Sequence, residues 1–102
     1  MKNVYMPTPA RVLDITQETS NITTLAVAGR ELAASPGQFV EVTIFGHGEF
    51  PVSIARILDP NREQFQVTIQ RRGRVTSEVR NLHVGSEIGI RGPFGRGFPL
   101  DV

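Results

Sequence analysis

The chain has 102 residues, of which 39% are hydrophobic and 21% charged, as expected for a single globular domain. It contains no cysteine, which excludes a disulfide framework and any cysteine-ligated zinc or iron–sulfur centre within these residues. The first residues lack the apolar core of a signal peptide, and no apolar run approaches the ~18 residues of a membrane helix. We therefore expect a cytoplasmic protein without a membrane span.

The net charge of +1 is unevenly distributed along the chain. Residues 1–70 carry five lysines or arginines against seven acids, a net charge of −2. Residues 71–102 carry six arginines against three acids, a net charge of +3. The basic C-terminal part is typical of a surface that faces an anion.

Six short segments have the β-branched composition or the apolar–polar alternation of strands. These segments are residues 10–16, 22–27, 38–45, 51–57, 64–70 and 87–91. The fourth segment opens with a proline, which has no N–H group for a strand ladder, so we expect that strand to begin at Pro51. Close turns separate the segments, and this pattern predicts an all-β fold, a small closed antiparallel barrel with six strands.

One short helix is predicted between the fifth and sixth strands. Val75, Val79 and Leu82 recur at helical spacing, which predicts a helix over residues 76–82. The whole chain, residues 1–102, is therefore expected to form one barrel domain with one helix after its fifth strand.

The sequence contains no recognisable catalytic set. His47 and His83 fall in separate loops, no cysteine nucleophile is present, and neither a His-Glu-x-x-His nor a Walker-type spacing occurs. We predict no catalytic residue and no metal site.

The junction between the fifth strand and the helix combines arginines, a glycine and hydroxyl residues. These residues are Arg71, Arg72, Gly73, Arg74, Thr76 and Ser77. Gly73 can take a positive φ and allows close backbone approach, and hydroxyls at a helix start can cap the helix or bind a phosphate. A plain strand–glycine–helix connection with Thr76 as the N-cap explains the same residues. The residues alone leave both interpretations open.

Two further motifs are each ambiguous by themselves. Residues 50–53, Phe-Pro-Val-Ser, fit either a ligand contact or an aromatic that closes a turn before a strand. Residues 92–98 contain three glycines and two aromatics, which allows close approach of a flat ligand but is also common in tight loops.

The order of four motifs resembles the flavin-binding domain of the ferredoxin-NADP reductase superfamily. The motifs are Pro-Gly-Gln-Phe-Val at residues 36–40, Pro-Val-Ser at 51–53, Gly-Arg-Val-Thr at 73–76 and Gly-Pro-Phe-Gly at 92–95. The match spans nearly the whole chain. Within the superfamily, the chain resembles the gamma subunit of cytoplasmic hydrogenases and sulfhydrogenases, and the electron-transfer subunits of anaerobic sulfite reductase and of dihydroorotate dehydrogenase.

The resemblance implies a six-stranded Greek-key barrel that holds FAD against one side. In the family, the segment that matches residues 50–53 lies along the isoalloxazine ring, residues 69–71 match the ribityl and adenosine side, and residues 73–77 match the pyrophosphate site. The cofactor-binding residues implied by this match are Phe50, Pro51, Val52, Ser53, Ile69, Gln70, Arg71, Gly73, Arg74, Val75, Thr76 and Ser77.

The chain departs from the family pattern in the first flavin motif. Many members have an arginine where this chain has Phe50, and an aromatic residue where it has Val52. A charged phosphate contact and a ring stack are therefore both missing, and each loss weakens binding by about 1–3 kcal/mol. The arginines at 71, 72 and 74 are alternative sources of the missing charge.

The resemblance also implies that these residues are a fragment of an NAD(P)H-linked oxidoreductase. Family members continue into a nucleotide-binding α/β domain, and these subunits often end in cysteines that hold a [2Fe-2S] cluster. The implied function is to relay electrons from NAD(P)H through FAD to an iron–sulfur centre. The implied partners are the nicotinamide-nucleotide domain of the same parent chain and other redox subunits, so the fragment alone is not expected to be catalytically complete.

Two alternatives remain open from the sequence. One is a structural or interaction barrel that does not retain flavin. The other is a nucleic-acid-binding barrel of the OB type that uses the arginines and Phe94 or Phe98 as its binding surface. The net charge of +1 and the absence of tryptophan disfavour nucleic acid as a partner.

Overall fold

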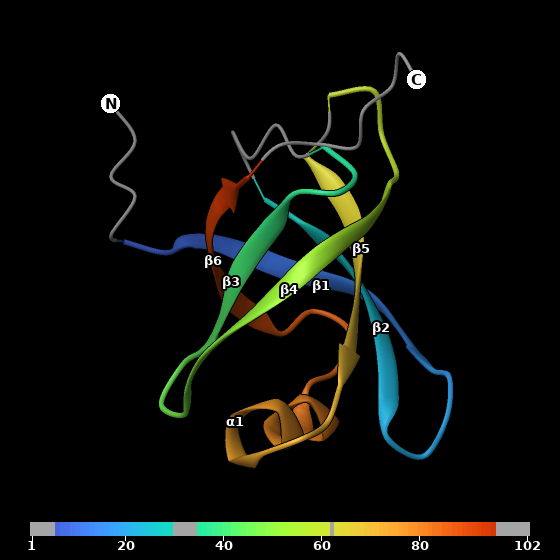
Figure 1. Ribbon diagram of the computed structural model, residues 1–102, viewed down its shortest axis with the longest axis vertical. Helices are drawn as coiled ribbons and strands as arrows, with labels where there is room; N and C mark the ends of the chain where they lie inside the picture. The colour runs from blue at the N-terminus through green and yellow to red at the C-terminus, as the bar shows by residue number, and fades with distance from the viewer. Residues whose placement is uncertain (1–5, 30–34, 62, 96–102) are drawn as a thin grey trace.

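Six antiparallel strands close into a barrel in a computed structural model that describes residues 6–29, 35–61 and 63–95 (Figure 1). The strands are β1 (Thr8–Gln17), β2 (Ile22–Ala28), β3 (Phe39–Ile44), β4 (Gly48–Ile57), β5 (Gln64–Gln70) and β6 (Glu87–Phe94). Their spatial order is β1-β2-β5-β4-β3-β6, so β2 lies beside β5 and β6 returns between β1 and β3, as in a Greek key. The predicted all-β barrel is confirmed.

The helical segment begins earlier than the sequence predicts. It consists of α1 (Arg74–Ser77) followed by a 3-10 turn, η1 (Glu78–Asn81), in place of one helix over residues 76–82. Neither segment, at four residues each, has the length or apolar character of a membrane-spanning helix within the described chain. The last three residues of the 92–98 motif lie outside the described residues.

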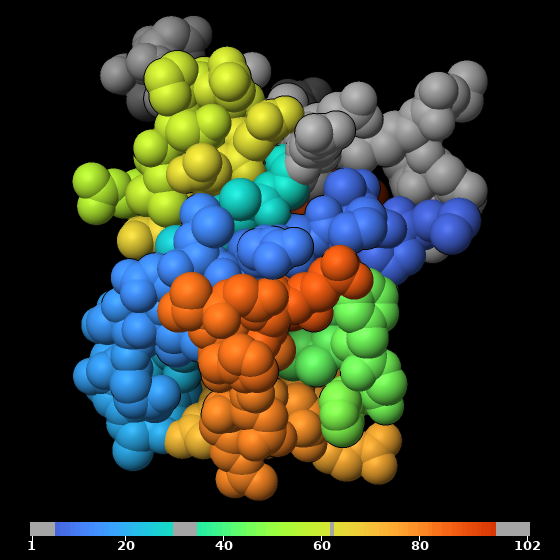
Figure 2. Space-filling model, turned by 180° about the vertical axis from the view of Figure 1, so that it is seen from behind, coloured from blue at the N-terminus to red at the C-terminus, as the bar shows by residue number. Residues whose placement is uncertain are grey.

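The barrel interior is filled by the inward-facing residues of all six strands and by one residue of η1. The largest fully buried side chains are Phe65, Leu25, Ile54, Ile88, Ile90, Val12, Val27, Val40, Val42, Val67 and Val79. Seen from behind, β1 crosses the molecule next to the start of β6, with which it pairs at Ala10 and Ile88, and the two strands cover this core (Figure 2). Burial alternates residue by residue in β3 and β5, whereas β2 and β6 each contain three consecutive buried residues.

The expectation that the fourth strand begins at Pro51 is wrong, because β4 begins at Gly48. Ile54 donates its N–H to the carbonyl of Gln38 over 2.8 Å, so the backbone groups of Ile54 face β3. Backbone groups alternate along a strand, which places the nitrogen of Pro51, three residues earlier, on the side away from β3. Pro51 therefore lies inside the strand without breaking the β3–β4 ladder.

The turn between β3 and β4 packs against the helical segment at one end of the barrel (Figure 1). A Cβ atom placed on Gly48 would lie 3.0 Å from Cγ2 of Val75. In the turn next to Gly48, the imidazole Nε2 of His47 lies 3.6 Å from a carboxylate oxygen of Glu78. These contacts fix the start of α1 beside the start of β4.

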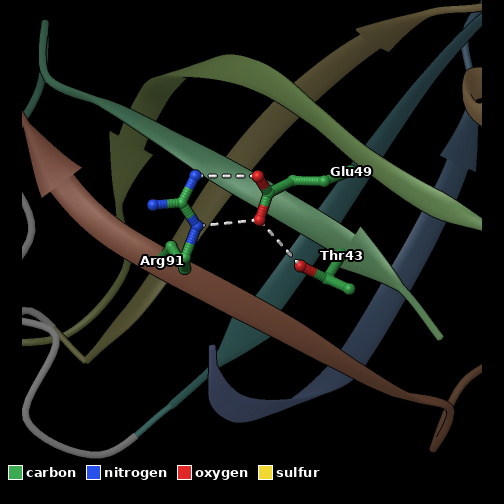
Figure 3. Close-up of polar contacts among 3 residues, drawn as sticks. All are labelled: Thr43, Glu49 and Arg91. Atoms are coloured by element: carbon green, nitrogen blue, oxygen red, sulfur yellow. Dashed lines mark hydrogen bonds and ion pairs between the residues drawn. The ribbon is translucent and has the colours of Figure 1, made fainter. Parts of the chain in front are cut away.

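An ion pair on the outer face joins β4 to β6 across β3 (Figure 3). Arg91 donates from Nε and Nη2 to the two carboxylate oxygens of Glu49, at 2.9 and 2.8 Å, and the hydroxyl of Thr43 donates to the same carboxylate at 3.1 Å. The hydrogen bond from Arg91 lowers the pKa of Glu49. Burial, and then the Glu49 charge, raise the pKa of the neighbouring Glu41.

We predict that Gly48→Ala destabilises the fold by about 1–3 kcal/mol, because φ at Gly48 is +134° and the added methyl group meets Val75. Gly73→Ala is the matched control, since φ there is −152° and a Cβ would meet no atom within 4 Å. Urea unfolding of both variants measures the difference. Equal stabilities for the two variants would contradict the packing described here.

A second prediction concerns pH. The folded-state pKa of Glu49 is depressed, so its contribution to stability is present above its unfolded pKa of about 4.5 and is lost as the pH falls through the folded value. Glu49→Gln should therefore lower Tm at pH 7, and the difference from wild type should shrink toward pH 3. Glu87→Gln, which removes an exposed carboxylate with no ion pair among the described residues, is the control. If Glu49→Gln lowers Tm by the same amount at pH 7 and pH 3, the ion pair of Glu49 with Arg91 does not contribute to stability as described.

Candidate functional site

The wall of the barrel opens between β4 and β5. Register pairs join these strands only at Ile54–Val67, Arg56–Gln66 and Ile57–Phe65, with an irregularity between Ile54 and Arg56. Residues 48–53 of β4 pair with β3 alone, and the end of β5 pairs with β2. We call the gap between residues 50–53 and residues 68–70 the β4–β5 seam.

A hollow of about 370 Å³ lies in the β4–β5 seam. It is lined by Phe50, Pro51, Val52, Thr68, Ile69, Gln70, Arg72 and Thr76. A second hollow, of about 430 Å³, is lined by Phe39, Pro51, Val52 and Ser53. The two hollows share Pro51 and Val52, so they adjoin at β4, and we call the two together the depression; Phe39 lies at one end of it and Arg72 at the other.

The structure brings part of the predicted cofactor-binding set into this depression. The residues that line it are Phe50, Pro51, Val52, Ser53, Ile69, Gln70 and Thr76. Arg71, Gly73, Arg74, Val75 and Ser77 line neither hollow. Two other hollows, which share Arg11, Ala28 and Gly29, contain none of the predicted residues.

Three lining residues, Phe39, Thr68 and Arg72, are absent from the predicted set. The alternation of β5 identifies two of them. Thr68 and Arg72 each lie two residues from Gln70, so all three fall on the outward face when the alternation is continued past the end of the strand. Arg71 falls on the opposite, inward face by the same alternation, and its Nε is buried with no hydrogen-bond partner among the described residues. Phe39 reaches the depression only because β3 pairs with β4, opposite Ser53.

The start of α1 is held by the hydroxyl of Thr76. This oxygen accepts hydrogen bonds from the N–H groups of Arg72 at 2.9 Å and Gly73 at 3.1 Å, and its proton is donated to the carbonyl of Gly73 at 3.2 Å. The N-cap is Gly73, so the interpretation of Thr76 as the N-cap is wrong. Gly73 is extended, at φ −152°, so it does not use the positive φ that its glycine allows. The hydroxyl of Thr76 thus makes three hydrogen bonds within this loop, which hold the loop in place and use the full hydrogen-bonding capacity of the hydroxyl.

The other end of the depression has an aromatic wall. The ring of Phe39 lies 5.3 Å from that of Phe94, at an interplanar angle of 37°, and the guanidinium of Arg91 lies 5.7 Å from the Phe94 centroid. Gln38, just before β3, donates from Nε2 to the carbonyl of Gly95, just after β6, at 3.0 Å. Arg91 therefore contacts this wall with the same guanidinium that pairs with Glu49.

The depression is apolar along its floor and carries charge at one end. Phe50 and Ile69 are buried, and Val52 is partly buried against the same core. Arg72 is the one charged residue that lines either hollow among the described residues. In these residues, no group of three or more metal-ligating side chains is close enough to hold a metal ion. Such a site is suited to an elongated ligand with an apolar part and an anionic part.

Comparison with known proteins gives two kinds of likeness. The chain is 39% identical over 106 residues to sulfhydrogenase 2 subunit gamma of Pyrococcus furiosus, covering 98% of the chain and 36% of that relative. It is 36% identical over 103 residues to a probable dihydroorotate dehydrogenase B (NAD(+)) electron transfer subunit of Methanothermobacter thermautotrophicus, covering 98% of the chain and 37% of that relative. The chain thus spans little more than a third of these relatives. No family model matches the sequence.

Solved structures share the fold at lower sequence identity. An NADH-dependent reduced ferredoxin-NADP oxidoreductase matches with a TM-score of 0.77 and 19% identity, over 89% of this chain and 36% of that one. Ferredoxin-NADP+ reductase from Plasmodium falciparum matches with a TM-score of 0.77 and 18% identity, over 99% of this chain and 43% of that one. The chain therefore shares the barrel fold of these ferredoxin-NADP reductases, and the proteins similar to it in sequence include the gamma subunit of a sulfhydrogenase and an electron transfer subunit of dihydroorotate dehydrogenase B.

Proposed function

We propose that this chain is the FAD-binding barrel of an electron-transfer subunit. One observation carries the proposal, namely the pair of adjoining hollows at the β4–β5 seam, which have an apolar floor and, among the described residues, a single cation at one end. FAD has the same division, with a flat tricyclic ring at one end of a chain that carries two phosphates. The names of the homologous subunits support a role in electron transfer.

The ring end of the cofactor fits the part of the depression between Phe39 and Ser53. Phe39 is 39% exposed, so its ring offers the flat apolar surface that Val52 does not supply. Ser53 pairs with Phe39 across the ladder, and its exposed hydroxyl has no hydrogen-bond partner among the described residues. These residues suit a flat ring whose polar edge needs hydrogen bonds.

The seam itself adds backbone groups to the site. The backbone of Pro51 and Ser53 faces away from β3, and neither residue has a register partner in β5. Strand backbone groups without a partner are available to a ligand. The carbonyl of Pro51 and the N–H of Ser53 are therefore the backbone groups that this seam leaves available to a cofactor.

When bound, the flavin supplies hydride acceptance and single-electron transfer, and the polypeptide supplies position and hydrogen bonds. We propose that the parent protein passes electrons from NAD(P)H to an iron–sulfur centre. Residues 1–102 contain no cysteine, so the iron–sulfur centre is proposed to lie elsewhere in the parent protein or in another redox protein of the same enzyme. We propose that the nicotinamide nucleotide is bound by a further domain of the same parent chain.

Thr68→Trp tests the site, because the indole would fill the hollow from an exposed position on the outer face of β5. Thr16→Trp, at an exposed position of β1 away from both hollows, is the matched control. We expect FAD at tens of micromolar to raise the Tm of the wild type and of Thr16→Trp but not of Thr68→Trp.

Two outcomes would overturn the proposal. The first is an absence of any Tm shift or flavin fluorescence quenching with the wild-type chain, which would favour a structural barrel that does not retain flavin. The second is equal FAD affinity in Thr68→Trp and Thr16→Trp, which would place the flavin away from the seam. Circular dichroism of both variants checks that the fold is intact.

A further inference from the structure

We infer that Arg72 is the side chain that binds the phosphates of the flavin nucleotide, and that Gln70 holds it in position. The inference rests on the proposed function and deepens it, since it assigns to one of three neighbouring arginines the charge that Phe50 does not supply. It also fixes the ligand class, because a site built on this cation selects phosphorylated flavins over riboflavin.

The position of Arg72 separates it from the other two arginines. Arg72 lines the seam hollow together with Phe50, the residue that occupies the place of the expected arginine. Arg71 and Arg74 line neither hollow, and the Nε of Arg71 is buried without a hydrogen-bond partner in the described part of the chain. Of the three arginines, Arg72 alone lines the seam hollow.

The charge of Arg72 is not neutralised by a neighbour. Its Nε and Nη2 both donate to the same acceptor, Oε1 of Gln70, at 2.9 and 2.7 Å. No carboxylate in residues 6–29, 35–61 or 63–95 forms an ion pair with it. Gln70 is a neutral amide, so it orients the guanidinium and leaves both its positive charge and further N–H donors available. An anion is the partner that this arrangement lacks.

The backbone beneath Arg72 is also fixed. Its N–H donates to the hydroxyl of Thr76, which ties Arg72 and Gly73 to the first turn of α1. Gln70 is the last residue of β5 and pairs with Ile22 of β2. The guanidinium therefore projects from a segment anchored at both ends, which lowers the entropy lost when it binds a phosphate.

Fluorescence titrations with FAD, FMN and riboflavin test the assignment. We expect Arg72→Gln to weaken FAD and FMN binding by roughly tenfold to a hundredfold, the usual effect of losing a charged phosphate contact, and to leave riboflavin binding unchanged. Arg80→Gln is the matched control, because Arg80 is an exposed arginine of η1 that lines neither hollow. The affinity of the wild type for FAD should also fall with added salt, and that dependence should weaken in Arg72→Gln.

Gln70→Glu tests the role of Gln70 with Arg72 still in place. The substitution puts a carboxylate in the position of the amide oxygen, so Arg72 would be neutralised by its own neighbour. We expect FAD affinity to fall nearly as far as in Arg72→Gln, with riboflavin affinity unchanged. Gln64→Glu, at the opposite end of β5, makes the same charge change away from the seam and should bind FAD like the wild type.

The outcomes separate this inference from the proposed function. If the wild type binds FAD and Arg72→Gln binds it equally well, Arg72 is not the phosphate ligand, although the flavin site stands. If Arg72→Gln loses riboflavin to the same extent as FAD, Arg72 acts on the shape of the hollow and not on phosphate. If the wild type binds none of the three flavins, both the inference and the proposed function fail.

Discussion

The seam between β4 and β5 is the constraint on which the candidate site depends. A barrel normally pairs each strand with two neighbours along its length, and here Pro51 presents a nitrogen without a proton to the side where β5 would pair. The irregularity between Ile54 and Arg56 turns β4 at the point where pairing stops. The core stays closed because Phe50 and Ile69 remain buried beneath the opening. The described part of β4 thus leaves backbone groups unpaired along this seam, where a ligand can satisfy them.

Two sets of contacts keep the two ends of this opening apart. At one end the hydroxyl of Thr76 and the packing of Val75 on Gly48 hold the loop that carries Arg72. At the other end the ion pair of Arg91 with Glu49 ties β6 to β4 next to the aromatic wall. The Arg91–Glu49 pair is partly exposed, so its contribution to stability is modest. The sole cation that lines the depression among the described residues is oriented by Gln70 and has no counter-charge there.

Most of the fold could be predicted from the sequence, because alternation in strands such as residues 64–70 reports directly which face is buried. The start of β4 could not, since a proline is excluded only from the side of a strand that pairs, and the sequence does not say which side that is. The same alternation distinguishes Arg72 from Arg71, so this part of the site was accessible to sequence reasoning. The roles of Thr76 and Phe39 could not be predicted from the sequence. The role of Thr76 depends on a loop whose N–H groups at Arg72 and Gly73 donate to the Thr76 hydroxyl. The role of Phe39 depends on its pairing with Ser53 across two strands.

The amide of Ser53 tests the central claim most directly, because its N–H faces the seam and has no partner in β5. Hydrogen exchange at this amide, followed by NMR with and without saturating FAD, reports whether a ligand occupies the opening. We predict that FAD slows exchange at Ser53 and leaves the amides of the β1–β2 turn unchanged. Exchange at Ser53 that stays the same while FAD is bound would contradict the account.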